Sequence, residues 1–141
     1  MSFKGKPEKL VEQQVLAWCF KNNIDVNVFD SKAVFSYSKN SYSKNNGIPE
    51  GCADILGCDF DGKFFAIELK APGKEKVCRL SQYNFIKRKI KSGGFCLVCS
   101  DCETLNDVFF KWKDLNKDDG IQYLMSLLPK KVLINKKTIN I

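Results

Sequence analysis

The segment that most constrains the fold is Phe64-Phe65-Ala66-Ile67-Glu68-Leu69-Lys70, an apolar run of strand length that carries two charges at its far end. Side chains alternate between the two faces of a strand, so Glu68 and Lys70 should emerge on one face while the apolar residues between them point into a core. A carboxylate beside an ammonium on a half-buried strand forms either an edge-strand ion pair or a site for a charged ligand. This segment alone leaves both interpretations open.

The residues before this strand predict a hairpin. Its register decides whether Glu68 has a second carboxylate beside it. Residues 53–60 have the pattern of a strand, and Asp61-Gly62 is a turn signal. A two-residue turn would pair Asp54 with Leu69 and direct the Asp54 carboxylate away from Glu68. A three-residue turn over Phe60-Asp61-Gly62, with Gly62 left-handed, pairs Asp54 with Glu68 at a Cβ separation of roughly 4.5–5.5 Å. We predict the three-residue turn, which brings together two carboxylates that can hold one divalent ion.

Hydrophobic periodicity assigns the other elements. In chain order we expect a helix from Pro7 to about Asn22, a strand region at 24–37 broken near Asp30-Ser31, strands at 53–60 and 64–70, a helix at 79–92, a strand at 95–99, a helix opened by a capping box of Ser100 and Glu103, and a short helix at 121–128. The apolar run at 95–99 suits a buried parallel strand. The order α-β-β-β-α-β-α describes an α/β sheet with helices on its faces.

Length and composition fit one folded, basic domain. The chain has 141 residues, of which 44% are hydrophobic, and a net charge of +7. We expect a single domain over 1–141, with 129–141 as a basic C-terminal tail. The positive charge favours a polyanionic partner, but a basic protein without such a partner has the same composition. No long apolar stretch and no signal peptide are present, which predicts a cytoplasmic protein, bacterial or in the host cell if viral, without a membrane partner.

The chain has no histidine and seven cysteines. The lack of histidine excludes Ser-His and Cys-His catalysis and every His-ligated metal site. An odd number of cysteines, mostly inside apolar runs, predicts reduced thiols. Cys96, Cys99 and Cys102 have CxxC spacing, but Cys96 and Cys99 would face opposite sides of a strand, so we expect buried thiols rather than zinc ligands. Chemistry must therefore come from carboxylates, lysine, serine, tyrosine or cysteine.

Several basic residues are candidates for contacts with a nucleic-acid backbone. The polar segment 39–51 predicts either an ordinary surface loop or a mobile flap that meets such a backbone. The candidate contacts are Lys39, Lys44, Lys74, Lys76 and Arg79. The lysines of the C-terminal tail leave three alternatives open: a strand, an oligomer contact or a backbone-binding arm.

Four features, in this order, resemble the PD-(D/E)xK nuclease superfamily: Glu12 on the first helix, Asp54, the strand end Glu68-Leu69-Lys70, and Gln82 at the start of the next helix. Within that superfamily, residues 8–112 look like the small stand-alone members of the VRR-NUC family from phages and bacteria. The narrower resemblance rests on Gly51-x-Ala53-Asp54-Ile55-Leu56, on Gln82 with Phe85-Ile86, and on Gly93-Gly94-Phe95. Ala53 is a departure, because the family usually has proline before the aspartate.

The resemblance implies a restriction-endonuclease-like mixed sheet flanked by helices and a metal site for Mg²⁺ or Mn²⁺. Asp54, Glu68 and the backbone carbonyl of Leu69 would supply oxygen ligands, which these ions prefer. Glu12 would approach from the first helix to bind a water or a second ion, and Glu8 is the alternative helix acid. With few protein ligands, one or two ions could be bound.

The resemblance also implies catalytic roles. Lys70 would orient or deprotonate the attacking water, or screen charge on the phosphate. Gln82 would position the lysine, the water or a phosphate, although a polar residue at the start of a helix can also act only as a cap. Together with Asp54, Glu68 and Glu12, these residues form the predicted catalytic set.

The function implied is a metal-dependent DNA endonuclease that acts as a homodimer on branched DNA, in the manner of a Holliday-junction resolvase. Two alternatives stay open. One is another nuclease of the superfamily, such as a flap-directed, exonucleolytic or restriction-type enzyme. The other is a basic DNA-binding accessory protein that keeps the fold without turnover.

Overall fold

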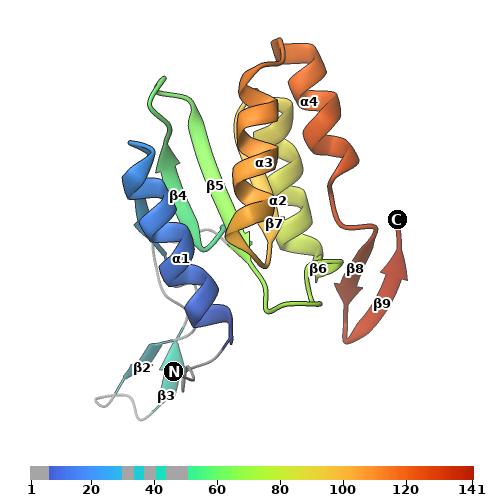
Figure 1. Ribbon diagram of the computed structural model, residues 1–141. Helices are drawn as coiled ribbons and strands as arrows, with labels where there is room; N and C mark the ends of the chain where they lie inside the picture. Colours follow the sequence, from blue (N-terminus) through green and yellow to red (C-terminus); the bar gives the residue numbers. More distant parts are fainter. Residues whose placement is uncertain (1–6, 30–33, 37–40, 44–50) are drawn as a thin grey trace.

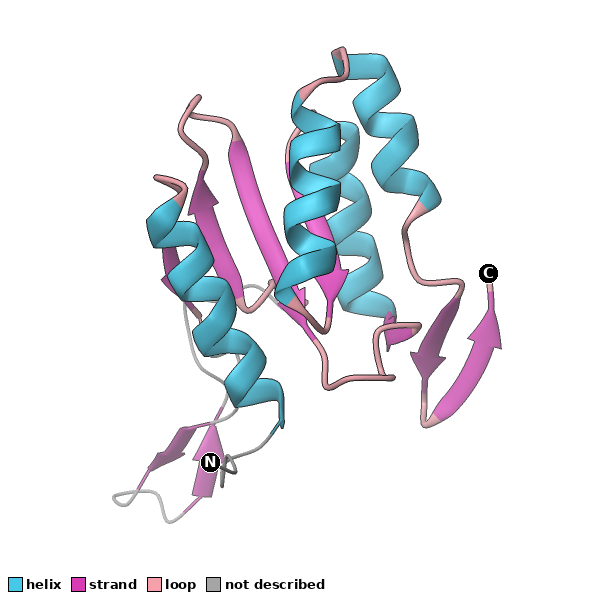
Figure 2. Cartoon of the chain, viewed as in Figure 1, coloured by secondary structure: helices cyan, strands magenta, loops and turns pink. Residues whose placement is uncertain are grey.

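A computed structural model describes residues 7–29, 34–36, 41–43 and 51–141 (Figure 1). The described part is a mixed α/β fold with four helices, two mixed sheets and a separate two-stranded hairpin (Figure 2). The helices and strands of the larger sheet follow one another in the predicted order, α-β-β-β-α-β-α.

The larger sheet has the strand order β1 (Asp25–Val28), β4 (Ile55–Cys58), β5 (Phe64–Leu69) and β7 (Phe95–Cys99). Strand β4 is antiparallel to both β1 and β5, and β7 is parallel to β5, as its apolar sequence predicted. Strand β5 lies inside the sheet, and its residues 65–69 are all buried. The interpretation of its charges as an edge-strand ion pair is therefore wrong.

Helices cover both faces of this sheet. On one face, Phe65 of β5 packs against Trp18 of α1 (Pro7–Lys21) and against Phe109 of α3 (Cys102–Lys113). On the other face, Glu68 contacts Gln82 of α2 (Leu80–Lys91). Because residues 65 and 68 point to opposite sides of β5, the aromatic contacts of Phe65 and the Glu68 carboxyl lie on different faces of one strand.

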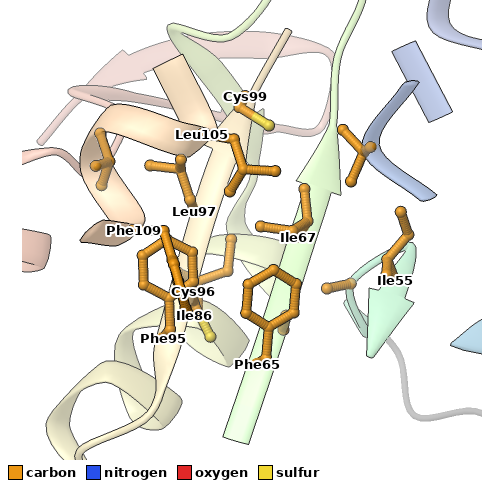
Figure 3. Close-up of a cluster of buried hydrophobic side chains, with 14 of the residues drawn as sticks. Ile55, Phe65, Ile67, Ile86, Phe95, Cys96, Leu97, Cys99, Leu105 and Phe109 are labelled. Atoms are coloured by element: carbon orange, nitrogen blue, oxygen red, sulfur yellow. The ribbon is translucent and has the colours of Figure 1, made fainter. Parts of the chain in front are cut away.

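Three fully buried phenylalanines form the centre of the core (Figure 3). The ring centroids of Phe65 and Phe95 lie 5.3 Å apart, and Phe109 meets both rings edge-on at 5.7 and 5.2 Å. These offset and edge-to-face geometries are the favoured arrangements of aromatic rings. The packing fixes β5 against β7 and α3, so the strand that carries Glu68 has little freedom to move.

The hairpin between β4 and β5 has the predicted three-residue turn. The N–H of Asp59 donates to the carbonyl of Lys63 at 2.9 Å, and the strand register pairs Ile55 with Ile67. Gly62 has the left-handed conformation that this turn requires, with φ of 78°. Continued one pair beyond Ile55 and Ile67, this register sets residue 54 opposite residue 68.

Three local predictions need correction. The capping box of Ser100 and Glu103 is wrong, because α3 is capped by Asp101, whose carboxylate accepts the N–H of Thr104 at 2.7 Å. The segment 39–51 is not wholly a loop, because β3 (Ser41–Ser43) pairs antiparallel with β2 (Val34–Ser36). The last helix, α4 (Lys117–Ser126), begins four residues before the predicted start, since the Asn116 side chain caps it.

The predicted C-terminal tail forms part of a second sheet. Strands β8 (Lys131–Ile134) and β9 (Lys137–Asn140) form an antiparallel hairpin, and β8 pairs in parallel with β6 (Val77–Arg79), a short strand that the sequence pattern did not indicate. Val132 of β8 is buried. Of the three alternatives for the tail, the strand is therefore confirmed.

A buried ion pair joins the β4–β5 turn to α3. The Lys113 ammonium lies 2.5 Å from Asp59 Oδ2, and the Asp59 side chain is completely buried. The other Asp59 oxygen accepts the N–H groups of Asp61 and Lys63 at 2.8 and 3.0 Å. Lys113 also contacts the carboxylate of Asp61, which is 56% exposed, at 2.8 Å. One lysine thus has a buried and an exposed partner.

We expect Lys113→Met to lower the free energy of unfolding by about 3–5 kcal/mol, because it leaves the buried Asp59 carboxylate without its cation. Asp61→Asn removes only the exposed half of the pair and should cost less than about 0.5 kcal/mol. Urea unfolding at neutral pH measures both changes. Equal costs for the two variants would contradict the assignment of the stabilisation to Asp59.

Candidate functional site

The two carboxyl groups predicted to share a face do so. Asp54 lies just before β4, and Glu68 lies opposite it near the end of β5. The N–H of Leu69 donates to Asp54 Oδ2 at 2.8 Å, which ties the aspartate to the neighbouring strand. The register of the hairpin and this hydrogen bond together hold the two acids side by side.

Glu68 is a buried acid with one unsatisfied oxygen. The residue is 3% exposed, and its Oε1 accepts a hydrogen bond from Gln82 Nε2 at 2.6 Å. Glu68 Oε2 is buried and accepts no hydrogen bond from the described residues. Burial, together with the charge of Asp54, raises the pKa of Glu68 to about 8. The described surroundings of Glu68 therefore favour a proton, or another positive charge, at this carboxyl.

The surroundings of Asp54 contain contributions that raise its pKa and contributions that lower it. Burial raises the pKa of Asp54, and the Leu69 N–H is the largest of the opposing contributions. The charge of Lys70 also lowers this pKa. Of the two acids, Glu68 is therefore the better proton holder and Asp54 the better permanent carboxylate.

Gln82 links the acid pair to the lysine. Its amide nitrogen donates to Glu68, and its Oε1 lies 3.3 Å from the Lys70 ammonium. The same Oε1 accepts the N–H of Arg79 at 2.9 Å, which caps the first turn of α2. Gln82 therefore caps α2 and also contacts both Glu68 and Lys70, and its role in catalysis stays a prediction.

Lys70 places its ammonium beside the acid pair. Its Nζ lies 3.7 Å from Glu68 Oε1, and its side chain is 20% exposed, so the charge reaches solvent. The N–H of Lys70 donates to the carbonyl of Cys99 at 3.0 Å, which continues the β5–β7 ladder past the end of the strand. The backbone that carries the lysine is thus held by the sheet.

Gly51 allows the Asp54 loop to approach α2 closely. Its φ is 78°, and a Cβ at this position would overlap the backbone carbonyl of Ser81 and lie 2.9 Å from the N of Gln82. A glycine is needed both for the conformation and for the space. This contact brings the loop that carries Asp54 against the helix turn that carries Gln82.

Two buried thiols border the site, and the sequence interpretation missed both. The charges of Glu68 and Asp54 act on Cys52, and those of Lys70 and Glu68 act on Cys78, which places the thiols close to the charged group. Burial raises the pKa of Cys52 and raises that of Cys78 to about 11, so both are protonated at neutral pH. Cys52 lies within the Gly51-x-Ala53-Asp54 motif, which is a usable signal, whereas Cys78 has none.

Glu12, rather than Glu8, is the acid of α1 that comes near the pair. Its charge raises the pKa of Asp54, whereas Glu8 is exposed on the helix. The Glu12 carboxylate pairs with Lys9 at 2.7 Å. Within the ranges that the structure describes, no three acidic, cysteine or histidine side chains are grouped so that they could hold a metal ion. Glu12 is therefore a neighbour of the pair, and its role as a further ligand stays a prediction.

The predicted backbone-binding residues divide into three groups. Lys74 and Lys76 are exposed in the segment between β5 and β6. Arg79 is exposed at the start of α2, and its charge opposes the rise in the pKa of Glu68. Lys39 and Lys44 lie outside the described residues.

A surface hollow of about 460 Å³ lies at the opposite end of β5. It is lined by Lys63 and Phe64 at the start of that strand and by residues of α2, α3 and α4. It shares no residue with the charged group around Glu68. The candidate site is therefore identified by its charges and hydrogen bonds, and this hollow belongs to another part of the surface.

No protein-family model, no curated protein and no solved structure matches the chain. The resemblance to the VRR-NUC family therefore rests on the residues themselves and stays a hypothesis. Among the helices that the structure describes, none is long and apolar enough to cross a membrane.

Proposed function

We propose that this chain is a DNA endonuclease that depends on Mg²⁺ or Mn²⁺, with a restriction-endonuclease-like core of the VRR-NUC type. The observation that carries the proposal is the pair of half-buried Asp54 and buried Glu68, with an unsatisfied oxygen on Glu68 and a lysine beside it. Asp59 in the neighbouring turn differs from Glu68, because backbone N–H groups donate to one of its oxygens and the Lys113 ammonium lies beside the other.

The residues present fit a hard divalent cation. Asp54 and Glu68 supply oxygen donors on one face, and the unsatisfied Glu68 Oε2 is a buried acceptor of the kind that a cation requires. Two protein carboxylates suit an ion that keeps several of its waters, as Mg²⁺ does. When bound, the metal would supply Lewis-acid activation at the scissile phosphate and lower the pKa of a water.

The remaining roles belong to the chain's own residues. Lys70, held by Gln82 and partly open to solvent, would screen the phosphate charge and orient the attacking water. Gln82 would keep both Lys70 and Glu68 in place, because one amide contacts the two groups. Arg79 lies close enough for its charge to act on Glu68 and would help to neutralise a phosphate at the edge of the site.

The substrate and the assembly come from the resemblance. We propose branched DNA as the preferred substrate and a homodimer as the active form, because two sites are needed to cut two strands symmetrically. The other nuclease types of the superfamily use the same residues, so only the substrate separates them.

Cleavage of a four-way junction, a flap and a linear duplex, each with Mg²⁺, Mn²⁺ or EDTA, tests the proposal. We expect metal-dependent cleavage that is fastest on the junction. Lys70→Ala should reduce the rate at least about 100-fold, because it removes the group beside the reacting water. Lys21→Ala, at the far end of α1, should leave the rate unchanged.

Three results would count against the proposal. If Lys70→Ala cleaves at the wild-type rate, the assigned site is wrong. If the flap or the duplex is the best substrate, the junction preference is wrong and another nuclease type of the superfamily is favoured. If no DNA is cut while binding persists, the chain is a DNA-binding accessory protein.

A further inference from the structure

The β8–β9 hairpin presents four lysines without an acidic residue nearby in sequence. The residues are Lys130, Lys131, Lys136 and Lys137, and residues 120–141 contain no aspartate or glutamate. None of the four forms an ion pair with any described residue, and the Lys130 ammonium donates to the backbone carbonyl of Ser126 at 3.4 Å. This charge is therefore not balanced within the described part of the chain.

The hairpin is one strand away from the candidate site. Strand β8 pairs with β6 so that Leu133 lies opposite Arg79, whose N–H donates to Gln82. Adjacent strands lie about 4.8 Å apart, and three extended residues span about 10 Å, so Lys136 lies within about 15 Å of Arg79. The β8–β9 turn also lies at the same end of the molecule as the segment between β5 and β6 (Figure 1).

Lys136 occupies a backbone conformation that lysine disfavours. The two turn residues, Asn135 and Lys136, have φ of 50° and 65°. Two left-handed residues in a two-residue hairpin favour the sequence Asn-Gly, because glycine adopts this conformation without strain. The first position has the favoured asparagine, but the second has a lysine. A glycine at position 136 would relieve this backbone strain, and the position is an exposed turn. A strained lysine at such a position indicates that its positive charge has a function.

We propose that the β8–β9 hairpin binds the sugar–phosphate backbone of duplex DNA beside the cleavage site. This inference rests on the proposed function for the identity of the polyanion. A reach of about 15 Å from Arg79 corresponds to about four base pairs, since each phosphate on one strand adds roughly 3.4 Å along the axis. Lys136 and Lys137 therefore contact phosphates within about four base pairs of the phosphate beside Arg79.

Binding measured without metal tests the proposal independently of catalysis. Fluorescence anisotropy with a 30-base-pair duplex in EDTA gives the affinity of the full chain at several salt concentrations. We expect the double variant Lys136→Gln, Lys137→Gln to bind about 10-fold more weakly at 100 mM salt, with a salt slope lower by about 1.8 because two phosphate contacts are lost. The matched control Lys91→Gln, Lys111→Gln removes the same charge from the ends of α2 and α3 and should leave both quantities unchanged.

A single substitution separates the binding role from a structural one. Lys136→Gly removes the charge and the strained conformation together, so we expect the Tm to rise by about 3 °C while the affinity for DNA falls several-fold. A turn lysine with only a structural role would not produce opposite changes in these two measurements. Unchanged affinity in Lys136→Gly, together with a higher Tm, would overturn the proposal.

The outcomes also separate this inference from the proposed function. If the wild type binds and cleaves DNA but the hairpin double variant binds equally well, the inference is wrong and the nuclease proposal stands. If the double variant binds more weakly but the wild type never cleaves, the inference stands and the nuclease proposal fails. If the double variant changes only the sedimentation coefficient, the hairpin is a subunit contact and the inference is wrong.

Discussion

Glu68→Gln should abolish metal-dependent cleavage and, at the same time, make the metal-free protein more stable at high pH. Glutamine has the shape of a protonated glutamate, so its carbonyl can accept the hydrogen bond from Gln82 and its amide can face the Asp54 carboxylate. It cannot become an anion. The variant therefore loses the charge that the proposed cation would bind and keeps the packing of the neutral acid.

The direction of the pH effect follows from the raised pKa. Glu68 has an ordinary pKa of 4.5 that burial raises to about 8 in the folded protein. The folded state therefore holds a proton between these values that the unfolded state has released, and stability falls as the pH rises from about 4.5 through 8. The full shift corresponds to a loss of roughly 5 kcal/mol. Asp54, whose pKa is also raised, contributes with the same sign.

Urea unfolding in EDTA at pH 5, 7 and 9 measures this effect. We expect wild type and Glu68→Gln to be similar at pH 5 and to separate by a few kcal/mol at pH 9, on the order of the loss above, with the variant more stable. Glu8→Gln, an exposed change on α1, should follow the wild type at every pH. Parallel curves for wild type and Glu68→Gln would show that Glu68 does not hold a proton in the folded protein.

Addition of Mn²⁺ provides a second readout on the same two proteins. A cation that binds only the folded state stabilises it by about 2.7 kcal/mol at 100 times its Kd. Because the cation competes with the proton on Glu68, the stabilisation of the wild type by Mn²⁺ should increase as the pH rises through 8. Glu68→Gln should show no gain at any pH. An equal gain in both proteins would place the cation elsewhere.

The part of the fold that the sequence could predict is the part where local and long-range signals agree. The turn over Phe60-Asp61-Gly62 fixes the register of β4 against β5, and the two strands continue that register from residue 58 back to residue 55 without a break. The position of Asp54 opposite Glu68 follows from those two facts. No knowledge of the rest of the chain is needed, which explains why this prediction succeeds.

The second sheet could not be predicted because its pairing has no local signal. Strand β6 has only three residues, and it pairs with β8 across more than fifty residues of intervening chain. Short strands between lysines look like exposed links, and only the burial of Cys78 and Val132 against the rest of the structure reveals them. The closeness of the basic hairpin to the site was hidden for the same reason.

Within the candidate site, the sequence predicted the residues better than their connections. Gln82 could be identified as polar at a helix start, but its contacts with both Glu68 and Lys70 depend on how α2 packs on the sheet. The sequence placed Glu12 at the border of the buried face of α1, but it did not predict the ion pair of Glu12 with Lys9. Side-chain direction is set by packing, which periodicity does not encode.

Gly51→Ala should damage the site without changing any charged residue. The added Cβ would overlap the backbone of Ser81, and a backbone carbonyl cannot rotate away as a flexible side chain can. The Asp54 loop and the first turn of α2 must therefore separate, which moves Asp54 and Gln82 apart. We expect the free energy of unfolding to fall by roughly 3 kcal/mol or more, and the cleavage rate to fall about 100-fold, as for a misplacement of about 1 Å.

Gly62→Ala provides the matched control for this change. Gly62 has the same φ of 78°, but a Cβ there would meet no atom within 4 Å. Gly62→Ala should therefore lower the free energy of unfolding by only about 1 kcal/mol, the cost of an alanine in the left-handed conformation. It should leave the cleavage rate at the wild-type value. The difference between the two variants isolates the contact between the Asp54 loop and α2. If both variants lose the same stability and keep full activity, this contact does not hold the site together, and the close approach at Gly51 serves only to turn the chain.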